Sequence, residues 1–70
     1  MAEEKRFTLT PRSKTAFNDV AQGVGAAYQK IVVLMEQEVL SNDEFEFFTE
    51  ATYALVDALK RLEALAKRAA

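Results

Sequence analysis

Four residues near the start of the chain have side chains suited to binding an anion. Arg6 and Phe7 precede a Thr10–Pro11 pair, and Arg12 and Lys14 follow it. Threonine caps helices and proline suits a first helical position, so the pair predicts a helix start with unpaired backbone N–H groups. Such groups beside several cations bind phosphate, and an aromatic ring can stack on a base. Arg6, Phe7, Arg12 and Lys14 are therefore a candidate site for a nucleotide-like anion.

A second set of side chains is suited to binding another protein. Phe47, Tyr53 and Val56 widen the apolar arc of their segment or fall off its main stripe. Exposed aromatic side chains often anchor protein interfaces, so these three residues form a candidate protein interface. The alternative is that the aromatic residues only pack inside the fold.

Catalytic chemistry is not expected from this composition. The chain has no cysteine and no histidine, which excludes thiolate metal sites, disulfides and imidazole bases. Glu36 and Glu38 are two positions apart and would point to different sides of a helix. Glu46 and Glu50 share a face that we expect to be solvated. The sequence predicts a protein that is not an enzyme and has no metal or cofactor.

The strongest local signal is the start of a helix after residue 41. Ser41 and Glu44 have the spacing of a capping box, and Leu40 and Phe45 flank them as a hydrophobic staple. We predict one helix over about 11–40, a turn at about 40–42 and a second helix over about 42–69. Residues 1–9 show no helical period and are predicted to be a flexible or extended arm, with the hairpin over 10–70.

Apolar residues recur at steps of three, four and seven along both helical segments, which predicts one stripe per helix. The fold class is therefore all-α, an antiparallel two-helix hairpin. The apolar arcs are too wide for two helices to cover each other, so we expect self-association into a four-helix bundle dimer or a higher oligomer. A different partner chain would satisfy the same requirement. The predicted helix–helix core is Phe17, Val24, Tyr28, Ile31, Phe48, Leu55, Leu59 and Leu62.

Two glycines interrupt the first helical segment, at Gly23 and Gly25. Each costs about 1 kcal/mol relative to alanine inside a helix, so a compensating role is expected. A close approach of the two helices is the first interpretation. A kink in the helix and a ligand resting on bare backbone are the alternatives.

The charges are segregated along the predicted hairpin. Seven carboxylates and no lysine or arginine lie between residues 31 and 59, near the turn, whereas eight of the nine cations lie toward the open end. Helix-dipole matching and solvated faces explain part of this pattern, and a binding surface is the alternative. The net charge of −2 argues against duplex DNA as a partner. No leader-like or membrane-length apolar segment is present, which favours a cytoplasmic protein without membrane contact.

At the level of layout the chain resembles two groups of proteins. The small hairpin chaperones of type III secretion share its size and its two helices. Phage-encoded cyclic-nucleotide sponges of the anti-CBASS type are similar in Thr10–Pro11, Gly25–Ala27 and Ser41. The expected function is protein binding, as an inhibitor, adaptor or chaperone. The expected partners are further copies of this chain, in a homodimer or higher oligomer, and another protein. The alternative is an oligomeric sponge for an anionic small molecule such as a cyclic oligonucleotide at the basic open end.

Overall fold

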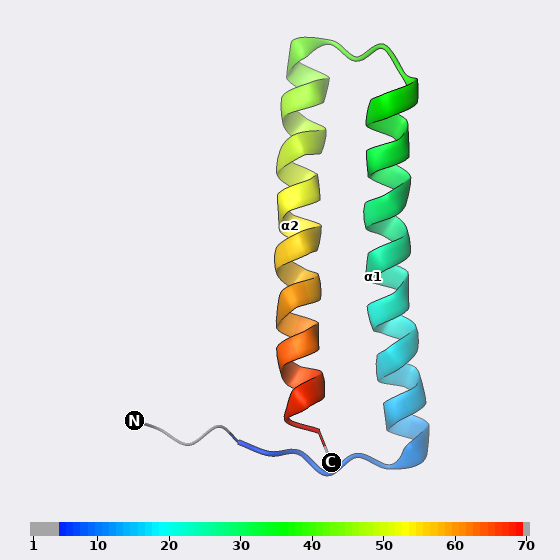
Figure 1. Ribbon diagram of the computed structural model, residues 1–70, viewed down its shortest axis with the longest axis vertical. Coiled ribbons are helices and arrows are strands. Elements are labelled where there is room, and N and C mark those ends of the chain that lie inside the picture. Colours follow the sequence, from blue (N-terminus) through cyan, green and yellow to red (C-terminus); the bar gives the residue numbers. More distant parts are fainter. Residues whose placement is uncertain (1–4, 70) are drawn as a thin grey trace.

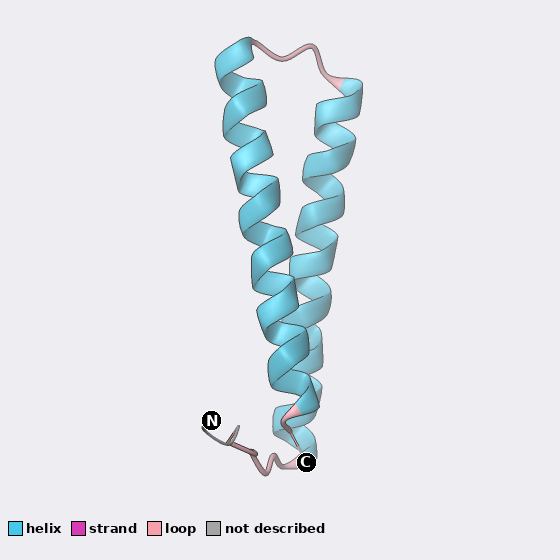
Figure 2. Cartoon of the chain, turned by 60° about the vertical axis from the view of Figure 1, so that its left-hand side comes forward, coloured by secondary structure: helices cyan, strands magenta, loops and turns pink. Residues whose placement is uncertain are grey.

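The protein is a hairpin of two long antiparallel helices, in a computed structural model that describes residues 5–69. Helix α1 covers Pro11–Gln37 and helix α2 covers Asn42–Lys67, and they pack side by side (Figures 1 and 2). The all-α, two-helix prediction is confirmed. Helix α1 ends about three residues before the expected position, because the backbone of Glu38 is extended. The Glu38 N–H still donates to the Leu34 carbonyl at 2.9 Å, which is the last bond of the helical pattern. The connection is therefore residues 38–41.

Both helix starts are fixed by local hydrogen bonds that the sequence predicted. The Thr10 hydroxyl accepts from the Ser13 backbone N–H at 3.1 Å, with Pro11 in the first turn. The Ser41 hydroxyl accepts from the Glu44 N–H at 3.2 Å, and Glu44 Oε1 accepts from the Ser41 N–H at 3.1 Å. Each cap satisfies backbone donors that an isolated helix leaves unpaired, and this fixes where each helix begins.

Helix α1 runs without interruption through both glycines. A Cβ atom built at Gly23 or at Gly25 would meet nothing within 4 Å. The expectation that these glycines permit a close approach of α1 and α2 is therefore wrong. Packing against α2 therefore does not account for the two glycines, which lower helix propensity.

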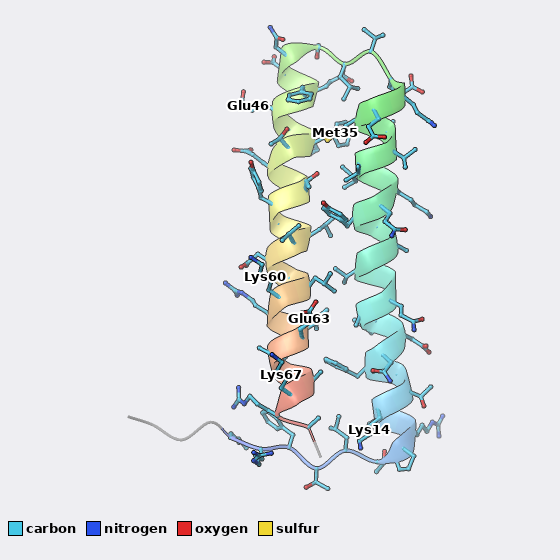
Figure 3. All side chains as sticks on the ribbon, in the orientation of Figure 1. Lys14, Met35, Glu46, Lys60, Glu63 and Lys67 are labelled. Atoms are coloured by element: carbon cyan, nitrogen blue, oxygen red, sulfur yellow. The ribbon has the colours of Figure 1, made fainter. Side chains whose placement is uncertain are left out.

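The packing between the helices is one layer thick. The principal extents are 46 × 31 × 12 Å, so the hairpin is flat, with two helices side by side and no third element over either face among the described residues. Met35 points from α1 toward α2 (Figure 3), and its sulfur lies 3.8 Å from the Thr52 hydroxyl. All eight predicted core residues are half-buried, and none of the described residues is fully buried. Stable domains are built from at least two packed layers, so one hairpin lacks the second layer that would complete a core.

The exposed area gives a measure of what is missing. The chain exposes 5959 Å². A compact monomer of 7.8 kDa exposes about 4,400 Å². The difference of about 1,600 Å² is surface that a compact protein of this mass would remove from water.

Residues 5–10 cross the open end of the hairpin, from beside the end of α2 to the start of α1 (Figure 1). Phe7 and Ala69 form a parallel bridge, in which the Phe7 N–H donates to the Arg68 carbonyl at 2.8 Å. Arg68 Nε donates to the Lys5 carbonyl at 2.7 Å. Residues 5–10 therefore tie the start of α1 to the end of α2. The predicted arm also includes residues 1–4, which lie outside the described residues.

Candidate functional site

Two of the predicted anion-binding residues line pockets at the open end. Phe7 lines an apolar pocket, and Lys14 lines a neighbouring pocket of about 170 Å³ with Asn18. Arg6 and Arg12 are exposed. The hydroxyls at this helix start bond within the chain, since Thr10 donates to Ser13 Oγ at 3.1 Å.

The Phe7 ring is already engaged by the protein's own cations. The Arg68 guanidinium carbon lies 5.2 Å from the ring centroid, and the Lys5 ammonium lies 5.5 Å from it. Both distances are within the range of attractive cation–π contacts. Because these contacts add to the backbone bridge, they hold the aromatic residue against α2. A base that stacked on this ring would compete with them.

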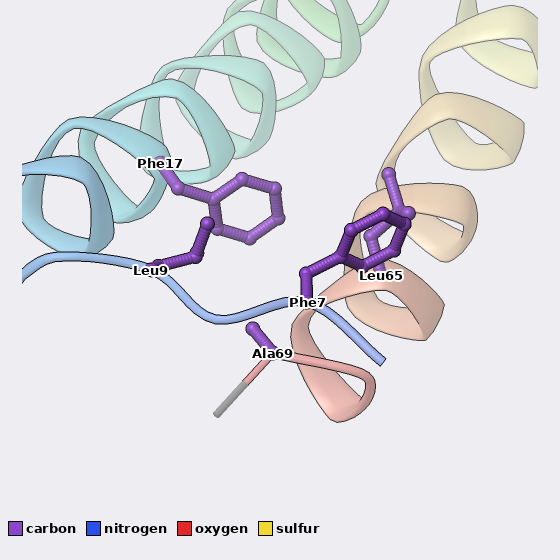
Figure 4. Close-up of a pocket in the computed structure, with 5 residues that line it drawn as sticks. All are labelled: Phe7, Leu9, Phe17, Leu65 and Ala69. Atoms are coloured by element: carbon purple, nitrogen blue, oxygen red, sulfur yellow. The ribbon is translucent and has the colours of Figure 1, made fainter. Parts of the chain in front are cut away.

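The pocket beneath Phe7 is small and apolar (Figure 4). Its volume is about 200 Å³, below the roughly 300 Å³ at which small-molecule sites begin. Its five lining residues are Phe7, Leu9, Phe17, Leu65 and Ala69. This pocket has the composition of a loosely filled hydrophobic cluster that closes the end of the hairpin.

A larger groove lies near the turn, between the two helices. Its volume is about 340 Å³, and the lining residues are Val32, Met35, Glu36, Phe45, Thr49, Thr52 and Tyr53. The Thr49 hydroxyl is buried and has no hydrogen-bond partner. The Thr52 hydroxyl donates to the Phe48 carbonyl at 2.8 Å. Buried hydroxyls are normally paired, so the Thr49 hydroxyl leaves an unused donor and acceptor beside the groove.

The three predicted interface residues lie at different places around α2. Phe47 and Tyr53 have 65% and 70% of their surface exposed, and Val56 is half-buried. At about 100° per residue, Phe47 and Tyr53 are separated by about 120° around the helix. Tyr53 lines the groove, whereas Phe47 packs edge-on against Phe48 with ring centroids 5.5 Å apart. Phe47 and Tyr53 therefore belong to two surfaces rather than one.

Helical spacing places Phe47 on a broad face that we call the uncharged face. The groove joins Val32 and Glu36 of α1 to Thr49 and Tyr53 of α2, so these flanks share one side of the hairpin. Each helix also has residues on the far side of its apolar stripe from the groove. Because successive helical positions turn by about 100°, these residues of α1 and α2 lie together on the opposite side of the hairpin. The uncharged face consists of Ala16, Val20, Gly23, Ala27 and Leu34 on α1 and Phe47, Ala51, Ala54, Ala58 and Leu65 on α2.

The uncharged face is apolar and largely open to solvent. Val20 is 56% exposed and Phe47 is 65% exposed, and Gly23 and Ala54 are exposed as well. Monomeric soluble proteins rarely leave a large contiguous apolar surface exposed, and such surfaces mark interaction sites. The sequence analysis did not identify this face, although the small residues on it already follow a helical repeat.

The charges on the other side and at the ends follow the sequence pattern. Glu46 lies near the turn, whereas Lys14, Lys60 and Lys67 lie toward the open end (Figure 3). Asp57 and Arg61 form an exposed ion pair at 3.1 Å on α2. The groove near the turn includes Glu36 in its lining and lies in the half of the hairpin that has carboxylates and no lysine or arginine, which attracts basic partners and repels acidic ones.

Within residues 5–69, no three acidic side chains gather in a way that could hold a metal ion. Neither described helix has a stretch apolar and long enough to cross a bilayer. Comparisons with protein-family models, with curated proteins and with solved structures found no match for this chain. The argument for its function therefore depends on the surfaces described above.

Proposed function

We propose that this protein is a non-enzymatic binding module, a homodimeric four-helix bundle that acts as an adaptor, inhibitor or chaperone for another protein. A second copy covers the uncharged face. The groove near the turn takes a basic segment of the other protein.

The observation that supports this proposal is the exposed area of the single hairpin. None of the described residues is fully buried, and the excess over a compact monomer is about 1,600 Å². Obligate dimers bury about 2,000–5,000 Å² in total, which is about 1,000–2,500 Å² from each chain. The excess lies inside that range. A second hairpin packed on the uncharged face would supply the missing layer.

The choice of face follows from the cost of removing charge from water. Burying an unpaired charged group is expensive, so an extensive interface between copies forms where charges are few. The uncharged face has no charged residue among its ten members, whereas the groove side includes Lys14, Glu36 and Glu63. The groove side therefore stays open for another partner.

The partner of the groove is a basic segment with one large apolar side chain. Tyr53 and Phe45 are 70% and 53% exposed and flank an apolar floor that includes Met35. The carboxylates in the half next to the turn, Glu36 of the groove among them, supply the attraction for lysine or arginine.

The mass of the purified protein in solution tests the dimer. Light scattering is expected to give twice the chain mass of 7.8 kDa. Phe47→Asp places a charge on the uncharged face and is expected to lower the dimer population at least tenfold. Tyr53→Asp is the matched control, because this residue is equally exposed on the same helix but lies in the groove.

A folded monomer at micromolar concentration would contradict the dimer. Equal loss of dimer in the two variants would contradict the assignment of the faces.

The absorbance ratio at 260 and 280 nm of the same sample tests the alternative, an anion sponge. The chain has no tryptophan and two tyrosines, so a bound nucleotide would dominate the spectrum.

Site-specific photo-crosslinking in the native host tests the groove. A p-benzoylphenylalanine residue replaces Tyr53 in one sample and Gln22, which is exposed on α1, in the other. We expect one protein adduct specific to position 53, with the crosslinked peptide containing lysine or arginine. The same adducts at both positions, or an acidic crosslinked peptide, would contradict the proposal.

A further inference from the structure

The two ends of the hairpin carry opposite charge. The half next to the turn contains seven carboxylates and no lysine or arginine, from residue 31 to residue 59. The open end carries the cations, and the described ones include Arg12, Lys14, Lys67 and Arg68. We call the turn end of the hairpin its acidic pole and the open end its basic pole (Figure 3).

We infer that the second copy packs head to tail on the uncharged face, with α1 against α1 and α2 against α2 and the acidic pole of each chain beside the basic pole of the other. This inference rests on the proposed dimer and adds its orientation.

The alternative orientation places both turns at the same end. It would bring two sets of seven carboxylates into one half of the bundle, with no cation between residues 31 and 59 of either chain. Like charges within about 10 Å repel at physiological ionic strength. The head-to-tail orientation replaces this repulsion with attraction at both poles.

The spacing of the uncharged face also suits a head-to-tail pair. Both helices repeat the steps four, three, four and seven. Placing a two-fold axis across the middle of each stripe puts small residues opposite small or large ones. The resulting pairs within the face are Gly23 with Ala27, Ala16 with Leu34, Ala54 with Ala58 and Phe47 with Leu65. Val20 and Ala51, the other two members, come opposite the exposed Lys30 and Arg61, which lie outside the face. Phe47 and Leu65 meet beyond the alanines on α2, so the alanine-lined middle lets the helices approach closely.

The same two-fold axis places ions of opposite sign at the edge of the interface. Arg12 of one chain comes opposite Glu38 of its partner, near the poles. Both residues are exposed in the single hairpin, so their side chains are free to pair when the second copy binds.

Pulsed electron paramagnetic resonance between two spin labels measures the orientation. The chain has no native cysteine, so a single Val39→Cys substitution gives one label per chain. Val39 is fully exposed in the turn, and a label there should not disturb packing. Gln22→Cys, exposed near the middle of α1, is the matched control because its label distance is short in either orientation.

A head-to-tail dimer gives about 40 Å between the labels at position 39, since α1 has 27 residues with a rise of about 1.5 Å each. The control pair at position 22 gives about 20 Å, set by adjacent helices about 10 Å apart plus the label arms. A distance of about 20 Å at both positions would overturn the head-to-tail orientation while leaving the dimer intact. Absence of dipolar coupling at both positions would overturn the dimer itself.

Discussion

At the scale of single residues, Gly23 and Gly25 have different surroundings although they are two positions apart. Gly23 is exposed on the uncharged face, and Gly25 is half-buried on the other flank of α1. A Cβ atom added at either position would have free space in the single hairpin. Gly25→Ala is expected to raise the free energy of unfolding by about 1 kcal/mol, because alanine is the better helix former. Urea denaturation with circular dichroism measures the change.

Gly23→Ala is the comparison that separates hairpin from dimer. In an isolated hairpin it should stabilise as much as Gly25→Ala does, since both sites are open. In the proposed dimer the new methyl group meets the second chain, so the gain should be smaller or reversed. Equal gains at the two positions would count against a close contact at Gly23.

At the scale of elements, the start of α2 depends on one hydroxyl. Ser41→Ala removes the acceptor of the Glu44 N–H and is expected to lower the free energy of unfolding by about 1 kcal/mol. Ser41→Asp keeps an acceptor at the cap and should retain most of the stability. The same denaturation experiment ranks the three proteins. A Ser41→Asp variant as unstable as Ser41→Ala would show that the cap is not what the serine provides.

A structural feature could be predicted from the sequence when the residues that determine it lie close together along the chain. Both caps were predictable because Thr10 with Ser13, and Ser41 with Glu44, act within four residues. The docking of Phe7 was not, since its partner is Arg68 and no local pattern links the two. The groove at Thr49 was missed because it depends on the rotation of one helix against the other.

At the scale of the whole molecule, folding and association should be one event. With none of the described residues fully buried, a lone hairpin has little to offset the loss of chain entropy. The midpoint of thermal unfolding should therefore rise with protein concentration, by about 5 °C for each tenfold increase in a dimer of this size. Calorimetry over a hundredfold range of concentration measures this shift. A midpoint independent of concentration would mean that the hairpin is stable alone.

The bridge between Phe7 and Ala69 has a consequence for the topology of the chain. Because residues near the two ends of the described chain are hydrogen-bonded neighbours, the backbone nearly closes into a ring. A ring has no preferred starting point, so a circular permutant that joins the old ends and opens at the exposed Val39 should keep both helices and their stripe. The order in which the helices are synthesised would be reversed, while the surfaces that the folded molecule presents would stay the same.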